Sequence, residues 1–338
     1  MGRIFSSLYV NHENEETYLA PCILHKYRKW LKSCTLTLNR PDGVYFIDDI
    51  IFAHLVVETI RPVFNVKLKA SIKGMLAYYE YRTHTGVLEL TKHYISYLVY
   101  ESTTSLKTDQ KEERFFSRGK NHFEFNLPVR AQCPPSFGCS TDFPHLCYCV
   151  SVFINLCTSA YSGFTNMGWE LLASLPIHIY TRNTKPITHL ASSPSAIFMA
   201  KCVDGKLLIR TDKKRYEAPE RITLYYKFYN LNEVTKMSVC LLQQIYVGKS
   251  MLERPYAKSV LNMDQLMDKG SVSLTLPGFH LQPTEERRIR GNIMINISYV
   301  VEGILTDVDG NIILKFKLPV EIANFPENTT NLIKALET

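Results

Sequence analysis

Hydrophobic and polar residues alternate with a period of two through much of this 338-residue chain. Residues 66–74 are the clearest case, because every second side chain is apolar and those between are mainly lysines. A period of two places successive side chains on opposite faces, so it predicts a strand with one buried face and one wet face. Similar β-rich runs occur at residues 35–38, 50–58 and 239–247. The pattern therefore predicts an all-β protein.

Residues 121–152 predict a strand, a rigid turn and a return strand. Apolar residues alternate with polar ones over 123–127, and Pro128 then removes the N–H that a strand ladder needs. The Pro134-Pro135 pair turns the chain, and the alternation resumes over 148–152. We expect these residues to form a corner at the edge of a β-sandwich. The polar stretch that precedes them, 101–120, is expected to be an exposed loop.

The length of the chain fits about two domains of roughly 100 to 200 residues each. Residues 175–180 read as the last strand of the first domain, and Pro176 predicts that this strand lies at an edge. The Thr-, Ser-, Asn- and Pro-rich stretch that follows is expected to be a linker. The predicted segments are an N-terminal extension at 1–32, a first domain at 33–182, a linker at 183–196, a second domain at 197–326 and a short tail at 327–338.

Two runs in the first predicted domain are similar to the arrestin family. Arrestin-like domains open with a vY-x-x-G-D-x-I hairpin and continue with an I-x-V-x-L-x-G strand, which Val44–Ile51 and Val66–Gly74 resemble. Asp48 stands where the family has glycine. This departure bears on the geometry of the turn, because aspartate enters the left-handed backbone region less easily than glycine.

The second predicted domain repeats the resemblance in the expected order. Residues 197–207 are similar to the opening of the C-terminal domain in the α-arrestin branch, and Lys214–Ile222 loosely match its y-x-P-G-E-x-I turn. Leu242-Gln243-Gln244 contains its L-x-Q. The chain is therefore identified as arrestin-like, closest to the arrestin domain-containing proteins. The resemblance implies two tandem immunoglobulin-like β-sandwich domains after a short N-terminal extension.

What the resemblance implies for function is non-enzymatic adaptor work. Similar proteins bind cytoplasmic tails of membrane receptors or transporters and link them to endocytic trafficking, ubiquitination or signalling. An uncovered sheet edge can take an extended peptide as an extra strand, with basic side chains nearby to contact its phosphate or acidic groups. The sequence contains no P-P-x-Y motif, so contact with a ubiquitin ligase or the endosomal machinery is expected to be indirect. A structural subunit of a retromer-type sorting complex is the alternative.

The N-terminal segment predicts contact with a membrane. Its first residues match the M-G-x-x-x-[ST] pattern for myristoylation, with Gly2 as the acceptor. A basic cluster with interleaved aromatic residues follows, and an acyl chain with a polybasic patch is a two-signal anchor to which Tyr27 and Trp30 would add interfacial contacts. The cationic members of this cluster are Lys26, Arg28, Lys29 and Lys32. The other interpretation is an unmodified extension whose charges are solvated.

The formal charge of +7 is modest for this length and does not indicate a nucleic-acid partner. A second basic cluster, Lys213-Lys214-Arg215, lies beside Asp212. Anionic lipid headgroups or phosphorylated tails are the partners expected for it. Without a secretory leader or an apolar run long enough to cross a bilayer, the expected location is cytoplasmic and peripheral at the plasma membrane or endosomes.

Nine cysteines are consistent with a reducing compartment, because Cys147 and Cys149 stand two apart in a predicted strand and cannot pair. A zinc site formed by Cys133, Cys139 and their neighbours would lack C-x-x-C spacing, so buried thiols are favoured and no metal or cofactor is predicted. A thioredoxin-binding role would need a reactive cysteine. The candidates are Cys157, Cys202 and Cys240.

Catalytic motifs are absent from the sequence. It contains no G-x-S-x-G elbow, P-loop, H-E-x-x-H or dinucleotide fingerprint. His122, His145 and His178 stand in strand or turn contexts, where hydrogen-bonded structural histidines are expected. We therefore predict that the protein is not an enzyme, since an enzyme would need a deep polar pocket that no motif indicates.

Overall fold

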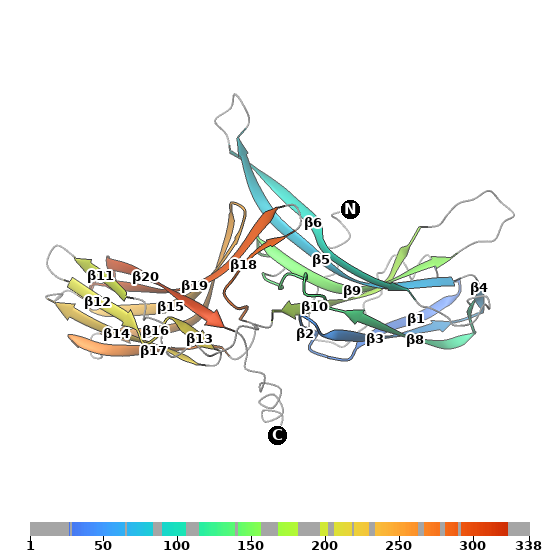
Figure 1. The fold of residues 1–338 in the computed structure, drawn as a ribbon, viewed down its shortest axis with the longest axis horizontal. Helices are drawn as coiled ribbons and strands as arrows, with labels where there is room; N and C mark the ends of the chain where they lie inside the picture. The colour runs from blue at the N-terminus through green and yellow to red at the C-terminus, as the bar shows by residue number, and fades with distance from the viewer. Residues whose placement is uncertain are drawn as a thin grey trace, which may run out of the picture. The chain divides into compact units, whose positions relative to one another are not determined.

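The computed structural model describes residues 27, 29–64, 66–83, 90–105, 115–138, 141–156, 168–181, 197–201, 206–217, 220–229, 234–262, 267–277, 281–289 and 292–323. The chain divides into two compact units, Met1–Tyr180 and Thr181–Thr338, and each contains its own group of sheets (Figure 1). The prediction of two tandem β-sandwich domains is confirmed. Among the described residues, no helix has the length and apolar character to cross a membrane.

The first unit is a sandwich of a three-stranded and a five-stranded sheet, with a short two-stranded ribbon. The three-stranded sheet has the order β1 (Leu31–Leu38), β3 (Ile50–Thr59), β8 (Gly119–Pro128). The five-stranded sheet has the order β2 (Val44–Phe46), β10 (Glu170–Tyr180), β9 (His145–Leu156), β5 (Val66–Thr83), β6 (Leu90–Ser105), and the ribbon joins β4 (Val63–Phe64) to β7 (Phe115–Phe116). Alternate residues of both sheets fill the core, where Tyr45, Leu55 and Ile72 are fully buried.

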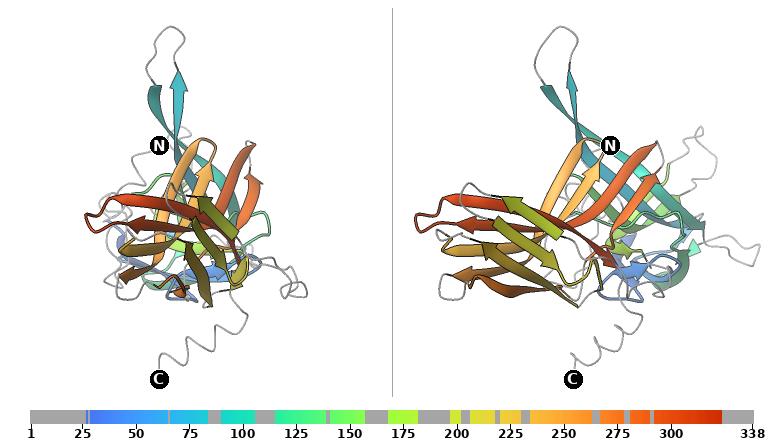
Figure 2. Two further views of the ribbon diagram at one scale, coloured as in Figure 1. Left: turned by 90° about the vertical axis from the view of Figure 1, so that its left-hand side faces the viewer. Right: turned by 60° about the vertical axis from the view of Figure 1, so that its left-hand side comes forward.

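The second unit repeats this plan (Figure 2). One sheet has the order β11 (Ile197–Lys201), β12 (Lys206–Thr211), β14 (Arg221–Tyr229), β17 (Lys269–Thr275). The other has the order β13 (Arg215–Glu217), β20 (Ile312–Ala323), β19 (Ile293–Thr306), β15 (Lys236–Val247), β16 (Ser250–Asn262), and β18 (Glu285–Ile289) also pairs with β19. Tyr216, Tyr299 and Phe316 are the largest fully buried side chains of its core.

The turn in which aspartate replaces the family's glycine adopts the left-handed conformation, since Asp48 has φ 71°. Its N–H donates to the Val129 carbonyl at 2.8 Å, and the Val129 N–H donates to the Asp49 carbonyl at 2.9 Å. The Asp49 side chain accepts from the Phe46 N–H at 2.9 Å and from Arg40 at 2.9 Å. Backbone and side-chain hydrogen bonds on both sides thus hold a conformation that costs aspartate more than glycine.

The segment from β8 to β9 is a crossing between sheets. β8 is an edge strand, as the sequence predicted, but β9 lies between β10 and β5 in the centre of the other sheet. The expectation that the return strand also lies at the edge is therefore wrong, because β9 has hydrogen-bonding partners along both sides. The corner itself is tied to β10, where Ser136 exchanges hydrogen bonds with Ile179 through its N–H and its hydroxyl, both at 2.8 Å.

Two further expectations about the first unit are refined. The expectation that 101–120 is an exposed loop is wrong for part of this stretch, because β6 runs to Ser105, β7 contains the buried Phe116 and β8 begins at Gly119. Pro176 lies in β10, which pairs with β9 along one side and with the short parallel β2 only over His178–Tyr180. Pro176 therefore stands where β2 does not reach, so its missing N–H leaves no ladder bond unmade.

Candidate functional site

The outward face of the five-stranded sheet carries a row of cations. Val66, Leu68 and Ile72 of β5 are buried in the core, so the alternating residues between them point outward. Register places Lys69 of this outward row beside Phe153 of β9. We call the exposed or half-exposed outward residues Lys67, Lys69, Lys73, Phe153 and Trp169 the lysine face.

Aromatic rings lie close to the ammonium groups of two of the three lysines of this face, Lys69 and Lys73. Lys73 Nζ lies 4.4 Å from the ring centre of Phe153, and Lys69 Nζ lies 6.0 Å from that ring and 5.7 Å from the ring of Trp169. Trp169 remains 43% exposed. Lys73 also approaches the Glu101 carboxylate at 3.7 Å. Such cation–π contacts restrict long side chains and leave their charge open to an anionic ligand.

Small polar side chains lie between the lysines on the same outward side. Register aligns Ser71, Ser151 and Ser174 across β5, β9 and β10, and Ser151 Oγ is 2.9 Å from Ser174 Oγ. The Cys149 thiol lies 3.4 Å from Ser151 Oγ, and burial raises its pKa. These serine and cysteine side chains are therefore uncharged, and Cys149 is not activated as a nucleophile.

The two sheets of the first unit also present edges. Strands β1 and β8 bound the three-stranded sheet, and β6 bounds the five-stranded sheet beside β5. Within the described residues no further strand pairs with the outer side of β1, β8 or β6. Such an edge offers N–H and C=O groups to an added strand.

The predicted N-terminal membrane cluster is only partly within the described residues. Gly2, Lys26 and Arg28 lie outside them, whereas Lys29 is exposed. Lys32 belongs to β1 and donates to the Glu58 carboxylate at 2.8 Å, which lowers the pKa of Glu58. The membrane role of these cations stays a prediction.

The interfacial role expected of Tyr27 and Trp30 is wrong, because both side chains are 6% exposed. The Tyr27 hydroxyl donates to the Glu170 carboxylate, and burial with this hydrogen bond raises the pKa of Tyr27. The Trp30 ring packs 5.1 Å from the Tyr27 ring and 6.0 Å from the Phe116 ring. These aromatic residues therefore close the core of the first unit.

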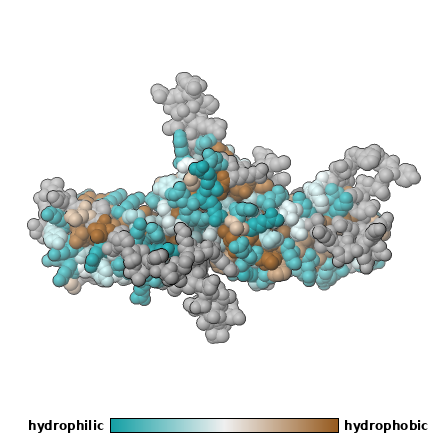
Figure 3. All heavy atoms as spheres, in the orientation of Figure 1, coloured by the Kyte–Doolittle hydropathy of each residue, from teal (hydrophilic) through white to brown (hydrophobic). Residues whose placement is uncertain are grey.

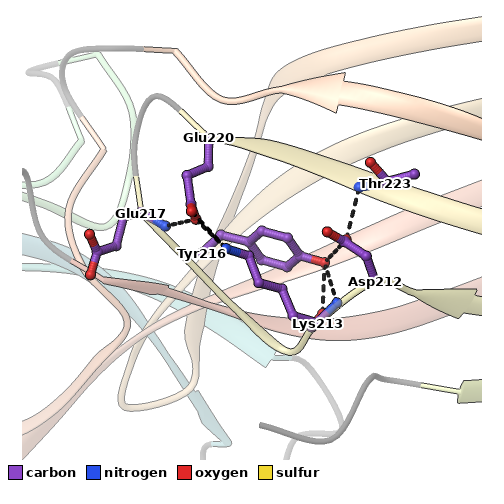
Figure 4. A network of polar contacts seen from close by, with 6 residues as sticks. All are labelled: Asp212, Lys213, Tyr216, Glu217, Glu220 and Thr223. Carbon is purple, nitrogen blue, oxygen red and sulfur yellow. Dashed lines mark hydrogen bonds and ion pairs between the residues drawn. The ribbon is translucent and has the colours of Figure 1, made fainter. Parts of the chain in front are cut away.

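The second predicted basic cluster is part of a closed polar network (Figure 4). Lys213 Nζ lies 2.7 Å from both carboxylate oxygens of Glu220, and Lys214 Nζ lies 3.2 Å from Glu321. Glu220 also accepts from the Glu217 N–H at 2.7 Å, which closes the turn before β14. Two of the three cations of Lys213-Lys214-Arg215 thus have carboxylate partners, and phosphate or lipid binding by them stays a prediction.

The buried end of the network is a tyrosine. Tyr216 is fully buried, and its hydroxyl oxygen lies 2.6 Å from Asp212 Oδ1. Burial and this hydrogen bond raise the pKa of Tyr216. Asp212 Oδ1 also accepts from the Thr223 N–H at 3.0 Å, which links the end of β12 to β14. The network stabilises the local structure, because the carboxylates of Asp212 and Glu220 each accept hydrogen bonds from a backbone N–H as well as from a side chain.

No group of three or more His, Cys, Asp or Glu side chains that could hold a metal occurs in the described part of the chain. Cys133 is buried, and Cys147 and Cys149 are partly so, whereas Cys139, Cys157 and Cys202 lie outside the described residues. Burial raises the pKa of Cys240 and outweighs the opposite effect of the Lys258 charge, so this thiol is not activated.

Sequence reasoning noticed the alternating lysines but not their aromatic neighbours. Phe153 and Trp169 are about 70 or more residues from the end of β5 in sequence, and only the register of β9 and β10 brings them close. The only local signal for these aromatic neighbours would have been aromatic residues at outward positions of another predicted strand.

Residues 34–161 match the family model described as arrestin (or S-antigen), N-terminal domain. This match begins at Cys34, inside β1, and extends past the end of β9 in the first unit. No curated protein matches the chain.

Proposed function

The chain belongs to the arrestin-like family, and on this premise we propose that it is a non-enzymatic adaptor that binds cytoplasmic segments of membrane receptors or transporters. The family match supports receptor-binding adaptor or scaffold work in general. The finer parts of the proposal are membership of the α-arrestin branch, a link to endocytic trafficking, ubiquitination or signalling, and a cytoplasmic, peripheral location. Indirect contact with a ubiquitin ligase or the endosomal machinery is a further part of the proposal.

The lysine face is the observation that carries the proposal. Lys67, Lys69 and Lys73 lie within the matched residues and point away from the core. Their ammonium groups are spaced along one strand, as phosphates or carboxylates are along an extended peptide. The free edge of β6, one strand away from β5, could pair with the backbone of such a peptide. We propose acidic or phosphorylated receptor tails as the ligands.

A peptide titration tests this function. Fluorescence anisotropy would compare a serine-rich acidic peptide with its phosphorylated form, using the full chain and the variant Lys67→Glu/Lys69→Glu. We expect the wild type to prefer the phosphorylated peptide and the variant to lose at least about tenfold in affinity, because two attractive charges become repulsive. Lys315→Glu is the control, since this exposed lysine belongs to β20 of the other unit. Equal affinities of the three proteins would refute the proposed site.

A structural sorting subunit is the competing proposal, and purification from cells separates the two. An adaptor should be recovered mainly alone, and proximity labelling should give membrane proteins as neighbours. Recovery only in a stoichiometric complex would favour the retromer-type alternative. Loss of membrane neighbours in Gly2→Ala would in addition support the acyl anchor.

A further inference from the structure

The outward face of the four-stranded sheet in the second unit has an unusual composition. β11, β12, β14 and β17 lie side by side (Figure 1), and none of these strands contains Asp or Glu. Alternate residues of β12 and β14 are buried, as the core positions Leu207, Ile209, Ile222 and Leu224 show. The residues between them form what we call the basic sheet face. Its cations are Lys206, Arg210, Arg221, Lys227 and Lys269.

Register arranges the basic sheet face in rows across the strands. One row runs from Ile197 through Arg210 and Tyr225 to Ser271. The next runs from Met199 through Leu208 and Lys227 to Lys269. Each row therefore places apolar residues at the β11 edge and cations further along. Within the described residues, none of the five cations has a carboxylate within ion-pair distance.

The other large face of this unit is different. On the six-stranded sheet, Lys317 lies 3.6 Å from Glu253 and 3.3 Å from Glu302. Charges of both signs therefore lie on that sheet and these three are paired, whereas on the basic sheet face the charges have one sign. The nearest acidic side chain along β12 is Asp212, which follows the strand and is held by Tyr216 and Thr223. The single sign is thus a property of this sheet and not of the whole surface.

Lys227 and Lys269 stand directly opposite each other on β14 and β17. Like charges at opposed positions destabilise a sheet. Asp268 directly precedes Lys269, but within the described residues no carboxylate lies within ion-pair distance of either lysine. The like-charge pair therefore costs folding free energy, which an anionic ligand would recover. Natural chains carry such a cost mainly where binding requires it.

Exposed aromatic and aliphatic side chains accompany the cations. Tyr225 and Tyr229 are 44% and 42% exposed, with Arg210 positioned 5.5 Å from the first ring centre and Lys227 4.5 Å from the second. Ile197 and Met199 are 63% and 68% exposed. On the face shown in Figure 3, hydrophobic residues form patches within a mainly hydrophilic surface.

We propose that the basic sheet face binds the surface of an anionic phospholipid bilayer. Lysine and arginine attract anionic headgroups, tyrosine prefers the interface, and exposed Ile197 and Met199 can enter the boundary of the acyl region. A single-stranded nucleic acid fits less well, because it stacks bases on open rings and gains nothing from exposed aliphatic side chains, and here each tyrosine ring has a cation over it. The proposal concerns the second unit and does not depend on the lysine face.

Vesicle co-sedimentation of the full chain tests the proposal. The probes are phosphatidylcholine vesicles with and without phosphatidylserine, and the variants are Lys227→Gln/Lys269→Gln, Met199→Gln and the control Lys315→Gln. We expect wild-type binding only with phosphatidylserine and a loss on raising salt. The double variant should bind at least about tenfold more weakly, Met199→Gln severalfold more weakly, and the control like the wild type.

A folding measurement separates binding from damage. Because the double variant removes a like-charge pair, its thermal midpoint should equal or exceed that of the wild type while vesicle binding falls. Undiminished binding by the double variant, or an equal loss in Lys315→Gln, would overturn the proposal. So would a single-stranded oligonucleotide that bound the wild type, failed to bind the double variant and displaced the protein from vesicles, since the face would then be a nucleic-acid platform. These results leave the peptide titration of the lysine face unaffected.

Discussion

Lys213 Nζ lies 2.7 Å from both carboxylate oxygens of Glu220, seven residues further along the chain. The same carboxylate accepts the Glu217 N–H, so one side chain closes a turn and neutralises a lysine. Both members of the pair are more than a third exposed, and the charge pair alone therefore contributes little stability. Most of the effect of Glu220 is expected to come from the backbone donor that it satisfies.

Replacing Glu220 tests how much stability comes from the charge pair with Lys213 and how much from the backbone hydrogen bond. Glu220→Ala should lower the free energy of unfolding by about 1 to 2 kcal/mol, because the Glu217 N–H loses its partner. Glu220→Gln keeps an acceptor oxygen and should lose less than half of that amount. Urea unfolding of both variants gives the comparison. If Gln destabilised the protein as much as Ala does, the carboxylate charge rather than the backbone hydrogen bond would be the main contribution.

The backbone at Asp48 leads to a second prediction. A left-handed conformation costs a side chain more than it costs glycine, and φ is 71° here. Asp48→Gly should therefore be neutral or stabilising by up to about 1 kcal/mol, since the relief of strain is offset in part by the entropy of glycine in the unfolded chain. Asp48→Val should destabilise by about 2 kcal/mol, because a branched side chain is least tolerated at positive φ.

Chemical denaturation of these two variants checks the order Gly, Asp, Val. A valine variant as stable as the wild type would show that the turn can move to negative φ without cost. The hydrogen bonds between this turn and Val129 make such a movement expensive.

The strands of this fold were predictable because a two-residue period is a local property. The alternation over Phe125 and Leu127 correctly assigned the buried face of β8, and that over Val66–Ile72 did the same for β5. The sheet to which each strand belongs was not predictable. The placement of β9 between β10 and β5 depends on pairings between residues that are far apart in sequence, such as Leu156 of β9 with Val66 of β5. No local pattern encodes such pairings.

The candidate surfaces likewise combine features that the local sequence predicts with features that depend on strand register. The outward lysines of β5 could be read from the period, whereas the neighbouring rings of Phe153 and Trp169 required the register. The run Lys213-Lys214-Arg215 was conspicuous in sequence, yet Glu321, which pairs with Lys214, comes from a strand about 100 residues away. The basic sheet face was not recognised at all, because its cations are single residues spread over separate strands.

Trp30 provides a third prediction, since the aromatic pattern around it looked interfacial but the residue is buried. Trp30→Ala should destabilise the first unit by about 3 kcal/mol or more, because it removes a large side chain packed against Tyr27 and Phe116. Lys29→Ala is the matched control, since this neighbouring residue is exposed and should change stability by less than about 0.5 kcal/mol. Thermal unfolding followed by near-UV circular dichroism measures both, and a Trp30→Ala midpoint equal to that of the wild type would contradict the packing.

Gly303 is expected to tolerate no side chain. A Cβ at this position would lie 1.9 Å from the Phe316 ring, which is 1% exposed and opposite it in register. Gly303→Ala should therefore cost about 2 to 3 kcal/mol. Gly168→Ala, where a Cβ meets nothing within 4 Å, is the control. In the Gly303→Ala background, Phe316→Leu should cost less than it does alone, and strict additivity of the two changes in urea unfolding would argue against a direct clash.

Burial of Cys34 predicts how stability depends on alkaline pH. The thiol is 1% exposed, and burial raises the pKa of Cys34 from 9.0 to about 12. Above pH 9 the unfolded chain loses this proton while the folded chain keeps it, so the folded state binds more protons and stability falls as pH rises. Between pH 8 and pH 10 the wild type should therefore lose about 1 kcal/mol more than Cys34→Ala, measured by urea unfolding with a reductant present. Parallel pH profiles of the two proteins would mean that the thiol ionises equally in both states, and a larger loss in Cys34→Ala would reverse the sign of the linkage.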